Sequence, residues 1–150
     1  MRAFTLTEAL IAFFILSLLA GGIFMVTNIA ILSWNSNRAM LEVVQEVRQA
    51  MDGMTREIRQ SNSPPGSESP EFEFSIPDVT NKIKYYCDND KKQLIREHPP
   101  GTKRVLANNI SFLNFTPTAS VLKIQIRATK TIRNVPHYFS LTEEVKLRNG

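Results

Sequence analysis

The residue of this chain with the most chemistry to explain is Glu8, which opens a long apolar stretch. After Glu8, no charged residue occurs until Arg38. An ionised carboxylate costs on the order of 2.5–3.5 kcal/mol at the centre of a bilayer and less near the interface. A residue with such a cost commonly has a function and an oppositely charged partner. We therefore expect a positive charge to lie close to Glu8, near a membrane.

The stretch that follows, Ala9 to Leu32, is long enough to cross a bilayer, which needs about 20 apolar residues in a helix. It is too long for the apolar part of a cleaved signal peptide, and no small-residue cleavage site follows it. We therefore expect residues 4–33 to form a transmembrane helix that stays in the mature protein. Trp34, near the far end, is typical of an interfacial anchor.

The residues from Ala3 to Glu8 resemble the processing site of type IV pilins and type II secretion pseudopilins. They present a small residue, an aromatic residue and an acid four positions beyond the aromatic. The resemblance implies that residues 1–3 are a leader peptide and that prepilin peptidase cuts between Ala3 and Phe4. It further implies that the new amine of Phe4 is methylated and that Glu8 pairs with this amine in a neighbouring subunit. Opposite charges attract strongly in a medium of low dielectric constant.

The sequence departs from the family pattern at three points. The leader has three residues and one basic side chain, Arg2, and Ala3 stands where Gly is commoner. Thr7 replaces the usual aliphatic residue before the acid. The alternative interpretation is an unprocessed signal anchor of a periplasmic binding domain, in which Glu8 is a tolerated charge.

Residues 34–60 predict an amphipathic continuation of the helix, so that one helix runs from about Thr5 to Gln60. An apolar stripe recurs at spacings of three and four, and it comprises Met40, Val44, Val47, Met51, Met54 and Ile58, broadened by Val43 and Ala50. We expect this stripe to pack on the chain's own β-sheet in preference to a coiled-coil partner. Gly21 and Gly22 are either a place where the helix bends on assembly or small residues that permit close helix contact.

The second half of the chain predicts an antiparallel β-sheet, which makes the fold class α+β. Residues 61–70 are rich in Ser, Pro and Gly and form a linker, and residues 71–150 form the sheet domain. The expected strands include 71–76, a hairpin of 82–87 with 93–97, 110–115, 121–129 and 137–147. Phe112 and Phe115 are expected in the core, and Thr116–Thr118 in a turn. The connections are too short for parallel crossovers.

A second, weaker resemblance lies in this half. Leu94, Arg96, Val105–Phe112 and Val145–Asn149 are similar to the corresponding region of J- or W-type minor pilins and pseudopilins. Together with the N-terminal motif, this resemblance implies a pilin-like fold, with a long helix covered by a C-terminal sheet.

The sequence favours a protein that is not an enzyme and holds no metal or cofactor. His98 and His137 lack a Cys or carboxylate neighbour at metal-ligand or triad spacing. Asp88–Asp90 lacks the downstream Glu of a calcium loop and is expected to be a hairpin turn. Cys87 is the only cysteine, so an intrachain disulfide is excluded, and a buried apolar role is expected for its side chain.

The chain has a formal net charge of +4, and most of its basic side chains follow residue 80. A basic face could bind DNA, lipid headgroups or an acidic subunit. Much of this charge alternates with apolar residues along strands, as on any solvated sheet face. A DNA-binding competence-type minor pilin is therefore the weaker alternative.

These observations predict a membrane-anchored structural subunit of a type IV pilus or type II secretion pseudopilus. The resemblance implies four partners: prepilin peptidase, other pilins or pseudopilins, the inner-membrane assembly platform and inner-membrane lipid. It also implies a cytoplasmic N-terminus and a C-terminal domain on the periplasmic or extracytoplasmic side.

Overall fold

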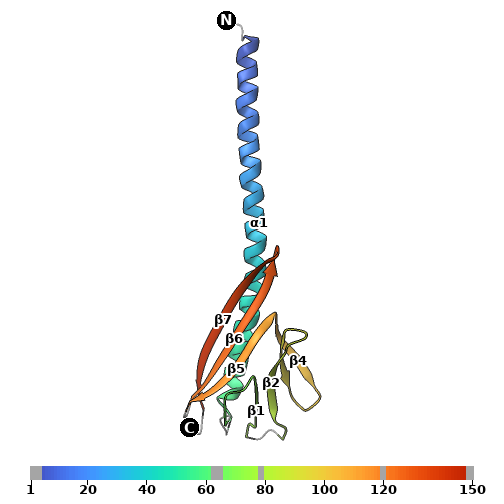
Figure 1. The fold of residues 1–150 in the computed structure, drawn as a ribbon, viewed down its shortest axis with the longest axis vertical. Helices are drawn as coiled ribbons and strands as arrows, with labels where there is room; N and C mark the ends of the chain where they lie inside the picture. The colour runs from blue at the N-terminus through green and yellow to red at the C-terminus, as the bar shows by residue number, and fades with distance from the viewer. Residues whose placement is uncertain (1–4, 62–65, 78–79, 119–120, 148–150) are drawn as a thin grey trace. The chain divides into compact units, whose positions relative to one another are not determined.

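The computed structural model describes residues 5–61, 66–77, 80–118 and 121–147. Within these residues the protein is α+β, as predicted, with one long N-terminal helix, α1 (Leu6–Ile58), and a β-sheet half (Figure 1). Contacts divide the chain between Arg38 and Ala39 into two units, which are described separately. The first unit holds the apolar part of α1, and the second holds the rest of α1 and all described strands.

The described strands form two antiparallel sheets, where the sequence predicted one. Their bounds are β1 Glu71–Phe74, β2 Ile83–Asp88, β3 Gln93–Glu97, β4 Lys103–Asn108, β5 Ile110–Thr118, β6 Val121–Ile132 and β7 Val135–Lys146. The first sheet has the order β1-β2-β3-β4, and the second has the order β5-β6-β7. Each hydrogen-bonded pair thus joins strands that are consecutive in the sequence. The predicted antiparallel arrangement and the predicted hairpin of β2 with β3 are confirmed.

The two sheets are joined through Ser69, near the end of the predicted linker. The Ser69 N–H donates to the Phe115 carbonyl at 3.1 Å, and the Phe115 N–H donates back to the Ser69 carbonyl at 2.9 Å. Ser69 therefore acts as a one-residue strand on the edge of β5. β1 then begins at Glu71, as predicted, and buries Phe72 and Phe74 while Glu71 and Glu73 are exposed.

Two predictions for β5 are wrong. Phe112 is 44% exposed, because a bulge between Ile110 and Phe112 shifts the alternation of the strand and turns Phe112 to the outer face. Residues 116–118 continue β5 opposite Val121–Lys123 instead of forming a turn. Pro117 is tolerated there because it lies two residues after Phe115, whose N–H points to the edge away from β6. The prediction that Phe115 is buried is confirmed.

The last hairpin is longer than the sequence predicted. β6 extends to Ile132, and β7 begins at Val135 instead of His137. The two residues between them, Arg133 and Asn134, have positive φ angles of 51° and 63°. This conformation gives a tight two-residue turn whose twist matches that of the strands, and Asn adopts it readily.

The amphipathic stripe of α1 is confirmed as the face that packs on the chain's own sheets. Val43, Val47, Ala50, Met51, Met54 and Ile58 are buried, and Met40 and Val44 are half-buried. They form one core with buried residues of both sheets, among them Phe72, Tyr85, Phe115 and Ile124. The 3.6-residue period of the stripe matches the face that a helix presents to a sheet.

Three polar side chains beside this core, Glu57, Tyr85 and Arg96, link α1 to the first sheet and are called the clamp below. The hydroxyl of the buried Tyr85 donates to Glu57 Oε2 at 2.6 Å, and Arg96 Nε donates to the same oxygen at 2.9 Å and to Oε1 at 3.2 Å. Burial first, and then the hydrogen bond and charge of Glu57, raise the pKa of Tyr85 well above its usual value. Tyr85 is therefore a neutral donor to an ionised acceptor, which is a strong kind of hydrogen bond.

Candidate functional site: the acidic start of the apolar helix

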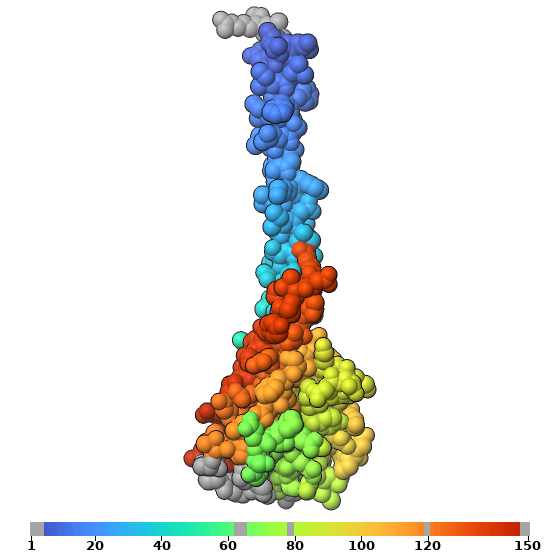
Figure 2. Space-filling view, in the orientation of Figure 1, coloured from blue at the N-terminus to red at the C-terminus, as the bar shows by residue number. Residues whose placement is uncertain are grey.

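The first unit presents an apolar helical surface. Its large hydrophobic side chains, from Leu6 to Trp34, are all exposed. In the space-filling view, this unit is the blue column (Figure 2). Among the described residues, α1 is the one helix that is long and apolar enough to cross a membrane. Exposed apolar area of this extent is rare on soluble proteins and marks contact with a membrane or another protein. The apolar segment predicted from the sequence is therefore present as a helix with an uncovered surface.

Glu8 lies in the first turn of α1 and closes a capping box with Thr5. The Glu8 N–H donates to Thr5 Oγ1 at 3.3 Å, and Glu8 Oε2 accepts from the Thr5 N–H at 3.4 Å and from Thr5 Oγ1 at 3.3 Å. Two N–H groups that a helix start leaves unpaired are thereby satisfied. The Thr-x-x-Glu spacing is the sequence signal of this motif, although no role was predicted for Thr5.

The capping box changes what the Glu8 carboxylate can do. Thr5 fixes the side chain against the helix start, where the positive end of the macrodipole also favours an anion. These interactions lower the cost of the charge without consuming all of its acceptor positions, since a carboxylate offers about four. Glu8 is exposed and can accept a further bond from an incoming cation.

The polar side chains inside the apolar segment are satisfied by the helix itself. Ser17 Oγ donates to the Phe14 carbonyl at 2.8 Å, and Thr27 Oγ1 donates to the Ile23 carbonyl at 2.8 Å. The Asn28 amide donates to the Phe24 carbonyl at 3.0 Å. Because hydrocarbon offers no hydrogen-bond partners, such internal bonds reduce the cost of these residues in a membrane.

Of the other site residues predicted in this region, the structure describes only the two glycines. Ala3 and Phe4, the predicted cleavage and methylation site, lie outside the described residues. Gly21 and Gly22 lie within the uninterrupted helix, and a Cβ atom added to either would meet nothing within 4 Å. A bend at these glycines on assembly stays a prediction.

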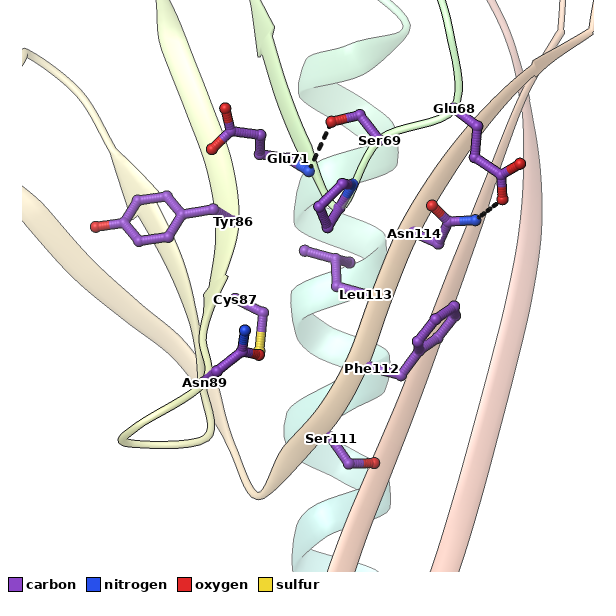
Figure 3. Close-up of a pocket in the computed structure, with 11 residues that line it drawn as sticks. Glu68, Ser69, Glu71, Tyr86, Cys87, Asn89, Ser111, Phe112, Leu113 and Asn114 are labelled. Atoms are coloured by element: carbon purple, nitrogen blue, oxygen red, sulfur yellow. Dashed lines mark hydrogen bonds between the residues drawn. The ribbon is translucent and has the colours of Figure 1, made fainter.

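A groove of about 550 Å³ lies between β2 and β5 (Figure 3). Tyr86 and Cys87 line it from β2, and Phe112 and Leu113 line it from β5. Cys87 is half-buried instead of buried as expected; it packs against the core, and burial raises the pKa of its thiol. A thiol with a raised pKa is a poor nucleophile at neutral pH.

The other candidate groups are placed apart from one another. Among the described residues, no group of three or more His, Cys, Asp or Glu side chains is arranged to hold a metal ion. Asp88 Oδ1 accepts from the N–H groups of Asp90 and Lys91, both at 3.1 Å, so this segment is the hairpin turn that was predicted. His98 Nδ1 lies 3.5 Å from the Lys82 carbonyl, and His137 is exposed on β7.

Several basic side chains of the sheet half are engaged within the protein. Lys82 and Lys84 pair with Glu73 at 3.1 Å and Glu71 at 2.8 Å. Other basic groups lie over rings, as Lys103 does on Tyr86 and Arg127 on Phe112. These local contacts offset part of the positive charge of this half.

Comparisons of the chain with protein-family models, curated proteins and solved structures found no match.

Proposed function

We propose that this protein is a minor pilin or pseudopilin, a membrane-anchored subunit that joins or primes a type IV pilus or type II secretion pseudopilus. One observation carries the proposal: a single acid, Glu8, stands in the first turn of a helix with an exposed apolar first part and a later part buried by antiparallel sheets. The order of small residue, Phe4 and Glu8 in the sequence supports the same proposal.

In the proposed mechanism, prepilin peptidase removes residues 1–3 and methylates the amine of Phe4. The subunit waits in the inner membrane with its N-terminus in the cytoplasm and its C-terminal domain on the other side. The assembly platform then extracts it, and its apolar helix packs against those of sister subunits. The Glu8 carboxylate accepts the Phe4 ammonium of a neighbour and thereby sets the axial register.

The pairing has a physical basis in the cost of isolated charges. Neither an ammonium nor a carboxylate is tolerated alone in an apolar bundle, because desolvation costs several kcal/mol per ion. A subunit placed one step out of register leaves both groups without partners. Charge pairing thus selects one arrangement, while the nondirectional apolar surface supplies the attraction.

The processing step is tested by the intact mass of the membrane-extracted protein, expressed with and without a prepilin peptidase. We expect the peptidase to remove Met1–Ala3 and to add one methyl group at Phe4. Ala3→Gly should be processed equally, because a small residue is kept, whereas Ala3→Trp should stay at full length. A full-length, unmethylated wild-type protein beside an active peptidase would leave only a signal-anchored domain.

A further inference from the structure

A second pocket, of about 370 Å³, lies between the last turns of α1 and the strands β3 and β4. Three arginines line it from three elements: Arg56 from α1, Arg96 from β3 and Arg104 from β4. Gly53 leaves space there, since an added Cβ atom would meet nothing within 4 Å. The pocket therefore combines room for a ligand with three guanidinium groups.

The charges in this pocket are not balanced by the protein. Glu57 is the one acidic residue that lines it, and both Glu57 oxygens already accept from Arg96, and one of them from Tyr85 as well. Arg96 uses Nε for these bonds, so its two terminal nitrogens remain available to a ligand. In the part of the chain that the structure describes, the side chains of Arg56 and Arg104 have no hydrogen bond or ion pair.

The arrangement has an electrostatic cost in the absence of a ligand. Arg96 and Arg104 are direct cross-strand neighbours in the register of β3 with β4. Like charges opposite each other on adjacent strands destabilise a sheet, and Arg56 adds a third positive charge to the same pocket. Local violations of this kind are expected at functional sites.

We propose that this pocket binds an oxyanion, either a carboxylate or a phosphate group. Arg56 and Arg104 supply paired N–H donors, whose planar fork matches the oxygens of both groups. Arg96, fixed by Glu57, forms the inner wall, and the Gln49 side chain also lines the site. The proposal goes beyond the proposed function and is independent of it, because none of these residues belongs to the apolar segment.

The test measures binding of inorganic phosphate and of succinate to the full-length protein in detergent by calorimetry, at constant ionic strength set with sodium chloride. The double variant Arg56→Gln/Arg104→Gln removes two donors. The matched control is Arg48→Gln/Arg59→Gln, which removes the same charge from exposed positions outside the pocket. We expect saturable binding to the wild type and the control, and at least about tenfold weaker binding to the pocket variant.

The source of the anion is distinguished by a third probe, a blocked Glu-Glu dipeptide. Tighter binding of the dipeptide than of phosphate identifies an acidic protein segment as the ligand, and the reverse order identifies a phosphorylated small molecule. Equal loss of binding in both double variants, or no binding beyond the effect of chloride, would overturn the proposal.

A second measurement guards against misfolding of the pocket variant. Because the arginines repel one another without a ligand, Arg56→Gln/Arg104→Gln should unfold at the same or a higher temperature than the wild type in anion-free buffer. A lower unfolding temperature would show that these arginines serve stability, and the proposal would fail.

Discussion

At the scale of single residues, Glu8 has two separable tasks. In the structure it completes a capping box with Thr5, which is a local task in the helix. In the proposed filament its charge pairs with the amine of another subunit. The first task needs a side-chain acceptor, and a Gln also serves in a capping box. The second task needs a negative charge.

This difference provides a test at one helix turn. Glu8→Gln keeps the cap and removes the charge, so we expect normal membrane insertion and loss of incorporation into filaments. Thr5→Ala removes the cap and keeps the charge, so we expect a helix start destabilised by about 1 kcal/mol and normal incorporation. Incorporation is measured in sheared filament fractions from cells that express the sister subunits. Equal loss in both variants would assign Glu8 to capping alone.

Tyr85 is one residue whose ionisation makes stability depend on alkaline pH. Its pKa is raised in the folded protein above the usual value of about 10. Its contribution to stability is therefore fully present below pH of about 10 and is lost as the pH rises through the raised pKa.

We expect Tyr85→Phe to lose about 1–2 kcal/mol at pH 8, because a hydrogen bond to a charged group disappears while Glu57 is 32% exposed. The difference from wild type should shrink at pH 11, where the Tyr85 hydroxyl ionises in the unfolded chain but stays protonated in the folded protein. Denaturation at both pH values measures it, with the exposed Tyr138→Phe as control. A difference that stays constant with pH would contradict the assignment.

At the scale of secondary-structure elements, the parts determined by local periodicity could be predicted from the sequence. The three-and-four spacing of the stripe from Val43 to Ile58 predicted the buried face of α1. The alternation of apolar and polar residues in β1 and the polar turn between β2 and β3 could also be predicted from the sequence. A local pattern predicts an element well when the same residues form both the pattern and the contact.

Features that depend on distant partners could not be predicted in this way. The bulge before Phe112 is defined by pairing with β6, and no local signal marks it. The link between the two sheets depends on the hydrogen bonds of Ser69 with Phe115, which lies far from it in the sequence. The clamp joins Glu57 to Tyr85 and Arg96 across separate elements.

The capping box, in contrast, could be predicted from the sequence, since Thr5 and Glu8 have the spacing of that motif.

At the scale of the whole molecule, the chain is divided between two environments. The residues of the hydrophobic core all lie after residue 38, in the second unit. The apolar residues before Arg38 are exposed and contribute nothing to that core. The second unit therefore contains the apolar burial that it needs for its own folding.

We expect a fragment of residues 36–150 to stay in solution without detergent and to unfold in one cooperative transition. The full-length chain should instead require detergent, because its exposed apolar helix remains. Sedimentation and thermal denaturation monitored by circular dichroism measure both properties. A soluble fragment without a cooperative transition would show that the preceding residues take part in folding.

The strand order described above has a consequence for how the chain acquires its structure. Because β2 to β4, and β6 and β7, each pair with the strand before them, each sheet needs only short loops to close, and such local pairing favours rapid folding. On the proposed topology, the chain emerges from the membrane beginning with the amphipathic part of α1, followed by each strand in turn. Apart from β1 and β5, which start the two sheets, every new strand then finds its partner already outside. The C-terminal half can thus assemble during translocation, without waiting for the last residue.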